Sequence, residues 1–208
     1  MLIGILADSH GSVVRLNRGI EALGERGADA LIHLGDIADT LRLDTVDDCI
    51  ELLIRNNIAG VMGNHEYSLV MHHFKRYPER FSETTMEYVC SLPRRLVLCD
   101  ICFTHFSDGD GVYGLFGPTD ERSYEEILRN SSWSVLVNGH SHDPRIYRRL
   151  NGVVENIVCD VGQPFELEEE ASYILTCGAL DDWYCALLDM NVRTFEVVSL
   201  HDRRTGGA

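Results

Sequence analysis

The sequence lacks any apolar run near the length of about 20 residues that a membrane-spanning helix needs. Its N-terminal apolar run, residues 2–7, is too short for a signal peptide and has no basic flank. Basic residues are also scarce, since 18 Lys and Arg stand against 33 Asp and Glu and give a formal net charge of −15. Such an acidic surface argues against membranes and long nucleic acids as partners. A small phosphate compound can still bind where a metal supplies positive charge.

The sequence also lacks a regular set of cysteines. It has seven, an odd number, and they are scattered along the chain. This pattern does not suggest a disulfide framework and is typical of a reducing cytoplasm. Cys99 and Cys102 form a CxxC motif, but no second CxxC accompanies it. They lie in an apolar run, residues 96–103, where side chains three apart on a strand face opposite sides. We therefore interpret both as structural.

The length of 208 residues predicts a single domain over 1–208, large enough to bury a core without a disulfide or zinc. In the N-terminal part, three apolar runs at residues 2–7, 30–34 and 58–62 are typical of buried strands. Residues 13–26 and 45–57 carry apolar side chains at spacings of three and four, as helices do. This βαβαβ order predicts a largely parallel sheet with helices packed on it.

The rest of the chain is predicted in less regular pieces. Helices are expected at 67–77, 82–92 and 124–130, and strands at 95–98, 101–105, 135–137, 146–150, 153–158, 173–176, 184–189 and 194–200. Asn151-Gly152 predicts a hairpin turn, and we expect the last third to be antiparallel. Residues 107–118 contain four glycines and no clear period, which indicates a functional or mobile loop. The polar tail after His201 is expected to fray.

Four short polar motifs each follow an apolar run, where a strand ends and a loop begins. They are Asp8-Ser9-His10, Gly35-Asp36, Gly63-Asn64-His65-Glu66 and Gly139-His140-Ser141-His142. In open α/β sheets, sites form at the carboxyl ends of the strands. In a chain of this composition Asp-x-His and Gly-Asp are each expected about once by chance, whereas Gly-Asn-His and Gly-His-x-His are rare. The signal is therefore the set of motifs taken together.

The donor atoms of these motifs suit a transition metal. The set combines carboxylates, an amide oxygen and imidazoles, a mixture that favours Mn²⁺, Fe or Zn²⁺ over Ca²⁺ or a thiolate-bound ion. These donors belong to Asp8, His10, Asp36, Asn64, His140 and His142. On an extended segment His140 and His142 point to the same side, so they can reach either one ion or two neighbouring ions.

Together with His105, these motifs resemble those of the calcineurin-like metallophosphoesterase superfamily, in the family's order from residue 8 to residue 142. Val161-Gly162-Gln163-Pro164 and the C-terminal strands resemble its small bacterial and archaeal phosphodiesterase branch. The resemblance implies an α/β fold of four layers, with two β-sheets packed face to face and flanked by helices.

The resemblance also implies a centre of two divalent ions, manganese foremost, with iron, zinc or nickel as alternatives. One ion would be bound by Asp8, His10, Asp36 and His142, and the other by Asp36, Asn64, His105 and His140, with Asp36 bridging. A bridging hydroxide would attack the phosphorus of a small phosphodiester or phosphomonoester. His65 matches the family's catalytic histidine, which donates a proton to the leaving oxygen, and Asp36 would help to orient it.

Some positions depart from the family pattern. His65-Glu66 resembles the protein Ser/Thr phosphatases, yet Val61-Met62 stands where those enzymes place an arginine, and Asp39-Thr40 where they carry Asp-Arg-Gly. His105 is followed by Phe106 instead of glycine. The alternatives are therefore a protein phosphatase or a nucleotide hydrolase, and then a non-catalytic scaffold. A homo-oligomer is possible.

Several other polar residues have a structural or surface role as their simplest interpretation. We expect His33 to be a structural residue, and His72 and His73 to lie on the surface or in a lid. Asp39 is expected to cap the segment after the second strand. Arg145, three residues after His142, can equally contact a substrate phosphate or lie in solvent.

Overall fold

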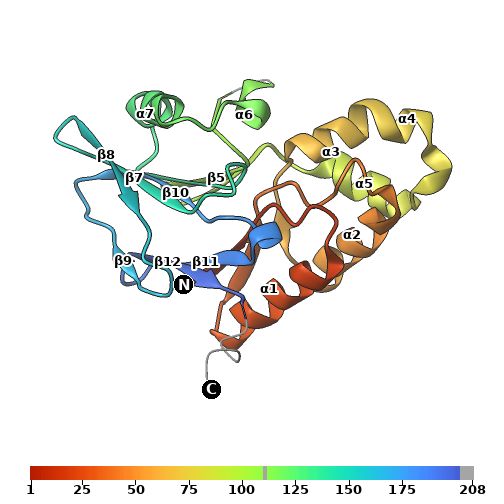
Figure 1. The fold of residues 1–208 in the computed structure, drawn as a ribbon, viewed down its shortest axis with the longest axis horizontal. Helices are drawn as coiled ribbons and strands as arrows, with labels where there is room; N and C mark the ends of the chain where they lie inside the picture. The colour runs from red at the N-terminus through yellow and green to blue at the C-terminus, as the bar shows by residue number, and fades with distance from the viewer. Residues whose placement is uncertain (110–111, 202–208) are drawn as a thin grey trace, which may run out of the picture.

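Two β-sheets packed face to face form the centre of the molecule, and helices cover both outer faces (Figure 1). The computed structural model describes residues 1–109 and 112–201. The first sheet has the strand order β3-β2-β1-β11-β12-β9, and the second has the order β4-β5-β6-β10-β7-β8. This arrangement confirms the predicted fold class, two sheets flanked by helices.

The strands of the two sheets are short. They are β1 (Leu2–Leu6), β2 (Ala30–His33), β3 (Ala59–Gly60), β4 (Arg95–Leu98), β5 (Ile101–Thr104), β6 (Val135–Asn138), β7 (Arg145–Leu150), β8 (Val153–Val158), β9 (Phe165–Glu166), β10 (Ser172–Thr176), β11 (Tyr184–Asp189) and β12 (Thr194–Ser199). The α-helices are α1 (Val13–Glu25), α2 (Val46–Arg55), α3 (Asn64–Ser68), α4 (Phe74–Arg76), α5 (Glu83–Ser91), α6 (Tyr113–Phe116) and α7 (Glu121–Asn130). Short helical turns are η1 (Leu43–Thr45), η2 (Leu69–His73, a π-helix), η3 (Pro78–Arg80) and η4 (Leu180–Asp182).

The N-terminal part forms the predicted βαβαβ unit. Strand β1 pairs with β2, and β2 with β3, in parallel. The Ser12 side chain caps α1 by accepting a hydrogen bond from the backbone N–H of Arg15. The third strand is shorter than predicted and comprises only Ala59 and Gly60. The carboxyl ends of β1, β2 and β3 therefore lie at one edge of the first sheet.

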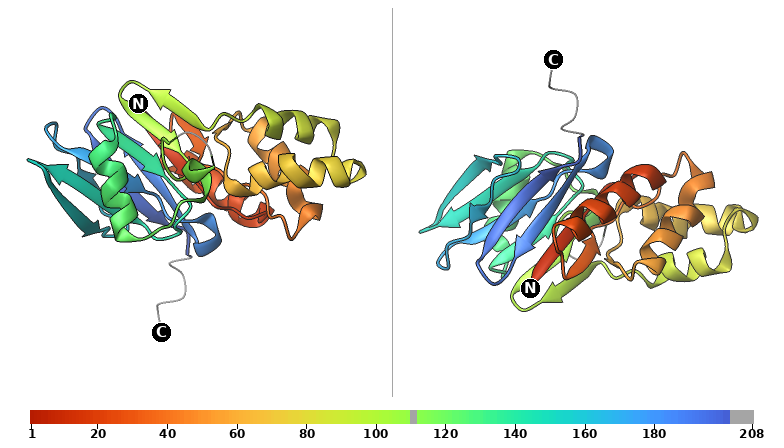
Figure 2. Two further views of the ribbon diagram at one scale, coloured as in Figure 1. Left: turned by 90° about the horizontal axis from the view of Figure 1, so that it is seen from above. Right: turned by 90° about the horizontal axis from the view of Figure 1, so that it is seen from below.

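Three apolar clusters hold the layers together. Helices α1 and α2 bury Leu16 and Ile50 against the outer face of the first sheet. Between the two sheets, Ile3 and Tyr173 belong to a second cluster. On the outer face of the second sheet, α7 buries Leu128. Helices α2 to α5 extend the molecule at one end, as both views of Figure 2 show.

The last third of the chain is only partly antiparallel. Strands β7, β8, β11 and β12 form antiparallel pairs as predicted. Asn151 and Gly152 link β7 and β8 with φ angles of 51° and 81°, as the predicted hairpin turn requires. Strand β10, however, runs parallel to β6, and β6 runs parallel to β5. The prediction of an antiparallel last third is therefore wrong for β6 and for its pairing with β10, although β10 does pair antiparallel with β7. The carboxyl end of β10 lies at the same edge as those of β5 and β6.

Two predictions in the middle of the chain also need correction. The helix expected at 67–77 begins at Asn64 and continues as α3, η2 and α4, so the Gly63-Asn64-His65-Glu66 motif forms a first helical turn. The loop expected at 107–118 contains helix α6. Its residues 110 and 111, and the tail predicted to fray beyond His201, lie outside the described residues.

Two smaller observations complete the fold. Cys99 is exposed at the turn between β4 and β5, whereas Cys102 is buried, which agrees with a structural interpretation of this pair. Among residues 1–109 and 112–201, no helix is both long and apolar enough to cross a lipid bilayer.

Candidate metal centre

The candidate site lies at the edge where the carboxyl ends of five strands meet. Residues predicted for the site follow β1, β2 and β3 of the first sheet, and β5 and β6 of the second. They are Asp8, His10, Asp36, Asn64, His65, His105, His140 and His142. The structure brings all eight together, because hydrogen bonds and ion-pair contacts connect each of them to another member of the set.

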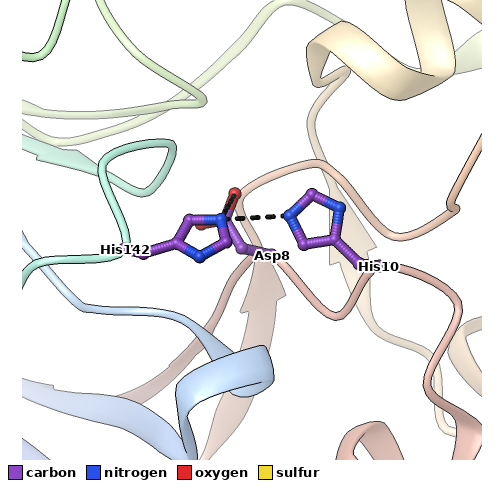
Figure 3. Close-up of side chains that lie close together, drawn as sticks. All are labelled: Asp8, His10 and His142. Carbon is purple, nitrogen blue, oxygen red and sulfur yellow. Dashed lines mark hydrogen bonds and ion pairs between the residues drawn. The ribbon is translucent and has the colours of Figure 1, made fainter.

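Asp8, His10 and His142 form a first group, shown in Figure 3. The Nε2 atoms of His10 and His142 face each other at 3.0 Å, and the Nε2 atom of His142 lies 3.7 Å from Asp8 Oδ1. Asp8 is fully buried, and its Oδ2 accepts a hydrogen bond from the backbone N–H of His140 at 2.9 Å. Its Oδ1 has no hydrogen-bond partner among the described residues. A buried carboxylate oxygen without a donor is costly, and a cation among these three side chains would compensate it.

Asp36, His105 and His140 form a second group. His105 Nδ1 donates to the backbone carbonyl of Leu34 at 2.8 Å, and His140 Nε2 donates to that of Gly117 at 3.1 Å. In a neutral imidazole the other nitrogen then carries a lone pair. Burial lowers the pKa of both rings to about 4, so both are neutral near pH 7.

The remaining nitrogens of this group face each other without a proton between them. His105 Nε2 lies 3.0 Å from His140 Nδ1, 2.9 Å from Asn64 Oδ1 and 3.5 Å from Asp36 Oδ2. Electron pairs directed at one another repel unless a cation lies among them. The donor set of two imidazoles, a carboxylate and an amide oxygen therefore fits a divalent transition metal.

His65 contacts Asp36 and lies in a third group with His10. The backbone N–H of Thr40 donates to His65 Nδ1 at 3.2 Å, which places the ring proton on Nε2. That Nε2 lies 4.0 Å from Asp36 Oδ2, and the backbone N–H of His65 donates to Asp36 Oδ1 at 2.9 Å. Asp36 thus belongs to two of these groups, and His65 presents an N–H to the site.

Burial sets the electrostatics of the centre. It raises the pKa of Asp8 well above the ordinary value, with a further increase from the Asp36 carboxylate. Burial also raises the pKa of Asp36 to about 6, against the lowering effect of His65. It lowers the pKa of His10 to about 4. The site therefore disfavours protonated imidazoles and bare carboxylates alike, and a bound cation would relieve both.

The backbone is strained at the same residues. Five of the eight have φ angles between 43° and 65°, a region that residues other than glycine rarely adopt. They are Asp8, His10, Asp36, His140 and His142. Gly63 is required for a different reason, because a Cβ atom there would lie 2.3 Å from Asp36 Oδ1. Strain of this kind concentrates at functional sites, where the surrounding structure holds it in place.

Sequence reasoning gave no role in the site to Glu66, which is fully buried beside it. Its carboxylate accepts three backbone hydrogen bonds, from Asp36 at 2.8 Å, Ala38 at 2.9 Å and Gly63 at 3.0 Å. Burial and the nearby Asp36 raise the pKa of Glu66 to about 7. Glu66 therefore ties the loop after β2 to the first turn of α3. Its position three residues after Gly63, that of the acidic member of a capping box, was the available signal.

Asp182 was also missed. Its Oδ2 lies 3.4 Å from His142 Nδ1, so it faces the ring nitrogen opposite the one that points at Asp8. A carboxylate in this position fixes the orientation of a metal-binding imidazole. Asp182 belongs to η4, which follows β10, and it reaches the site because β10 runs parallel to β6.

The residues for which a structural or surface role was expected lie around the centre. His33 is fully buried, and its Nε2 lies 3.2 Å from Ser9 Oγ, which donates to the carbonyl of Ile37. Asp39 accepts hydrogen bonds from the backbone of Leu41 and the side chain of Arg42, as a capping residue does. His72 is exposed and His73 partly buried on η2.

Comparison with known proteins adds the family. The sequence model of the calcineurin-like phosphoesterase superfamily domain matches residues 1–180. The chain belongs to this superfamily. The matched region contains all eight predicted site residues as well as Glu66, and it ends before β11 and β12.

Relatives of this phosphoesterase-family chain come from bacteria and archaea. The chain is 20% identical over 197 residues to the uncharacterized protein MJ0912 of Methanocaldococcus jannaschii, covering 86% of this chain and 76% of that protein. Its fold is similar to a metallophosphoesterase from Sphaerobacter thermophilus, with a TM-score of 0.76, 21% identity, and coverage of 96% of this chain and 88% of that one. Protein PH1004 of Pyrococcus horikoshii has a TM-score of 0.66 and 18% identity, with coverage of 95% and 87%.

Proposed function

We propose that this superfamily member is a metal-dependent phosphoesterase that hydrolyses small phosphodiesters or phosphomonoesters at a centre of two divalent ions. The observation that carries the proposal is the second group, in which His105 Nε2, His140 Nδ1 and Asp36 Oδ2 converge without a proton between them. The unpartnered Asp8 Oδ1 supports a second ion next to it.

The two ion sites share Asp36. We assign Asp8, His10, Asp36 and His142 to one ion, and Asp36, Asn64, His105 and His140 to the other. Two such ions, when bound, acidify a water molecule and neutralise negative charge that develops on phosphoryl oxygens. Asp182 would hold the His142 ring in orientation, and the carbonyls of Leu34 and Gly117 would do the same for His105 and His140.

His65 is the proposed general acid. The Thr40 N–H leaves the His65 proton on Nε2, the nitrogen that faces Asp36. From there it would be donated to the leaving oxygen of the ester, while Asp36 keeps the ring aligned through its hydrogen bond with the His65 backbone. Proton donation of this kind accelerates ester cleavage by about 10²–10⁴-fold.

The mixture of carboxylate, amide and imidazole donors favours manganese, with iron, zinc or nickel as alternatives. We also propose that residues 1–208 act as one domain in a reducing cytoplasm. All seven cysteines are free in the structure, and the two sheets share one buried cluster, which supports both statements.

The decisive experiment pairs elemental analysis of the purified protein with assays of phosphomonoester and phosphodiester hydrolysis, before and after Mn²⁺ is added. We expect about two metal ions per chain and metal-dependent turnover. Preferred cleavage of a phosphopeptide or a dinucleoside polyphosphate would favour the protein phosphatase or nucleotide hydrolase alternatives. Bound metal without turnover of any ester would indicate a scaffold, and absence of metal binding would refute the ligand assignment.

A further inference from the structure

A shallow cavity of about 590 Å³, open to solvent on one side, adjoins the candidate metal centre on the side of His142. Its walls come from the loop after β6, the start of β7, the end of β8 and the η4 turn. The polar side chains that matter below are His142, Asp143, Arg145 and Asp182. Since His142 lines this cavity, the alcohol part of a phosphoester held at the metal centre can extend into it.

Among the described residues that line this cavity, Arg145 is the one arginine or lysine. Its Nε donates to Asp143 Oδ2 at 2.7 Å, which fixes the plane of the guanidinium. Within the described part of the chain, neither of its two terminal amino groups donates a hydrogen bond. These groups are the ones that bind phosphate or carboxylate oxygens in pairs.

The other arginines of the same strand differ from Arg145. Arg148 uses all its nitrogens on Glu155 and Glu168, and Arg149 donates both terminal groups to the Arg129 carbonyl and Ser172 Oγ. Both therefore have structural partners. Arg145 alone among the three keeps its terminal groups unused, and it is the one beside the metal centre.

The two acidic side chains of the cavity outnumber its one arginine, but both already face partners inside the protein. Asp143 already accepts the Arg145 Nε–H, and Asp182 faces His142 Nδ1 at 3.4 Å. Each carboxylate thus has a partner inside the protein. The two terminal amino groups of Arg145, by contrast, are left to bind an anion, because a guanidinium has hydrogen-bond donors and no acceptor.

We propose that Arg145 binds a second anionic group, a phosphate or a carboxylate, on the alcohol part of the phosphoester substrate. The substrate class is then a small phosphoester with another negative charge a few bonds from the phosphorus that is attacked. This inference rests on the proposed phosphoesterase function and adds its specificity.

The test uses three substrates with the same carbon skeleton: propyl phosphate, propane-1,3-diyl bisphosphate and 3-phosphooxypropanoate, each also as its methyl phosphodiester. We expect kcat/KM to be higher for the substrates that carry a second anion, with the bisphosphate and carboxylate arms telling the two anions apart. In Arg145→Ala this preference falls by about 10- to 150-fold, the contribution of a hydrogen bond to a charged group. In Arg145→Lys it falls less, because the charge stays and the planar fork is lost.

Arg148→Ala is the matched control, since Arg148 lies on the same strand but outside the cavity. It should keep the wild-type preference. Equal kcat/KM for propyl phosphate and both substrates that carry a second anionic group, or an unchanged preference in both Arg145 variants, would overturn the inference even if the esters are hydrolysed. Absence of hydrolysis of every ester would instead count against the proposed function. Arg145→Lys keeps the test valid if Arg145→Ala does not fold.

Discussion

Asp36 is the residue on which both proposed ion sites depend, because its carboxylate faces both His65 and His105. In Asp36→Asn the amide nitrogen can take the place of the carboxylate oxygen that faces His105. Its N–H groups would then donate to the lone pair on His105 Nε2, which a metal ion would otherwise bind. We expect metal content to fall from about two ions per chain to fewer than one, with activity lost in parallel. Elemental analysis measures this, with Asp44→Asn at an exposed position as the control. Two retained ions in Asp36→Asn would exclude the bridging role.

His65 separates turnover from metal binding. Because its Nε2–H is proposed as the proton donor, His65→Ala should lower kcat by about 10²–10⁴-fold while the metal content stays within error of the wild type. The effect should be smaller for esters with a good leaving group such as p-nitrophenolate, which needs no proton. His72→Ala, at an exposed helical histidine, should change neither quantity. A His65→Ala variant with wild-type kcat on an alkyl ester would refute the assignment.

Glu66 shows how one buried carboxylate positions two loops. Glu66→Ala would leave three backbone N–H groups without an acceptor, those of Asp36, Ala38 and Gly63. We expect the free energy of unfolding to fall on the order of 3 kcal/mol, or roughly 6–12 °C in Tm. Thermal unfolding checks this against Glu87→Ala, an exposed position on α5 where a change within about 0.5 kcal/mol is expected. Similar Tm values for both variants would contradict the role of Glu66.

At the scale of elements, the segment around α6 supports the metal centre through one backbone carbonyl. Gly117 O accepts the hydrogen bond from His140 Nε2, and a Cβ atom at Gly117 would lie 1.8 Å from the Phe106 ring. Gly117→Ala must therefore displace this carbonyl, and we expect weaker binding of the ion assigned to His105 and His140, by about 10–100-fold. Metal titration followed by calorimetry measures this. Gly24→Ala is the control, because no described residue lies within 4 Å of a Cβ atom placed there. Unchanged affinity in Gly117→Ala would contradict this support.

The same segment carries the prediction that residues 107–118 line the substrate cleft. Deleting part of it should alter the order of preference across a panel of phosphoesters, because only Phe106 separates it from the proposed ligand His105. Identical relative kcat/KM values across that panel would refute the prediction. The preference set by Arg145 provides an internal comparison, since its cavity lies on the His142 side of the centre.

How much of the fold and the site can be predicted depends on whether the sequence of an element indicates which elements lie next to it. Each motif follows an apolar strand, and parallel strands end at one edge, so the meeting of Asp8, Asp36 and His140 follows from pattern alone. The direction of β10 relative to β6 has no local signal, because a strand has the same alternation in either direction. For that reason the approach of Asp182 to His142 could not be predicted. The role of Glu66 depends equally on how two loops pack.

For the whole molecule, burial of so many ionisable groups makes the metal-free fold sensitive to pH. The pKa of Asp8 is raised, and those of Asp36 and Glu66 are raised to about 6 and 7, so the native state binds more protons than the unfolded one. Their stabilising contribution is full below the unfolded-state values and is lost as pH rises through the native ones. Buried imidazoles act in the opposite sense, since their pKa values lie near 3 or 4 in the native state.

These two effects predict an optimum for the metal-free protein near pH 6.5. Below it, protonation favours the unfolded state, whose histidines titrate near pH 6.5; above it, the buried carboxylates lose their protons. Tm measured with a chelator from pH 5 to pH 8.5 should therefore pass through a maximum, in one transition if residues 1–208 form a single domain. A Tm that rises steadily from pH 6 to pH 8.5 would contradict this explanation.

Metal ions should reverse the alkaline side of this profile. An ion binds the deprotonated carboxylates and neutral imidazoles, so its affinity increases with pH, whereas protons compete with it in acid. With Mn²⁺ at about 100 times its dissociation constant, stabilisation of about 2.7 kcal/mol should raise Tm by roughly 5–10 °C at pH 8. At pH 5.5 the same concentration should have a much smaller effect. Asp36→Asn supplies the control, because a variant that binds fewer ions should show a smaller shift in Tm. An equal shift in Tm at both pH values would show that the ion does not bind these ligands.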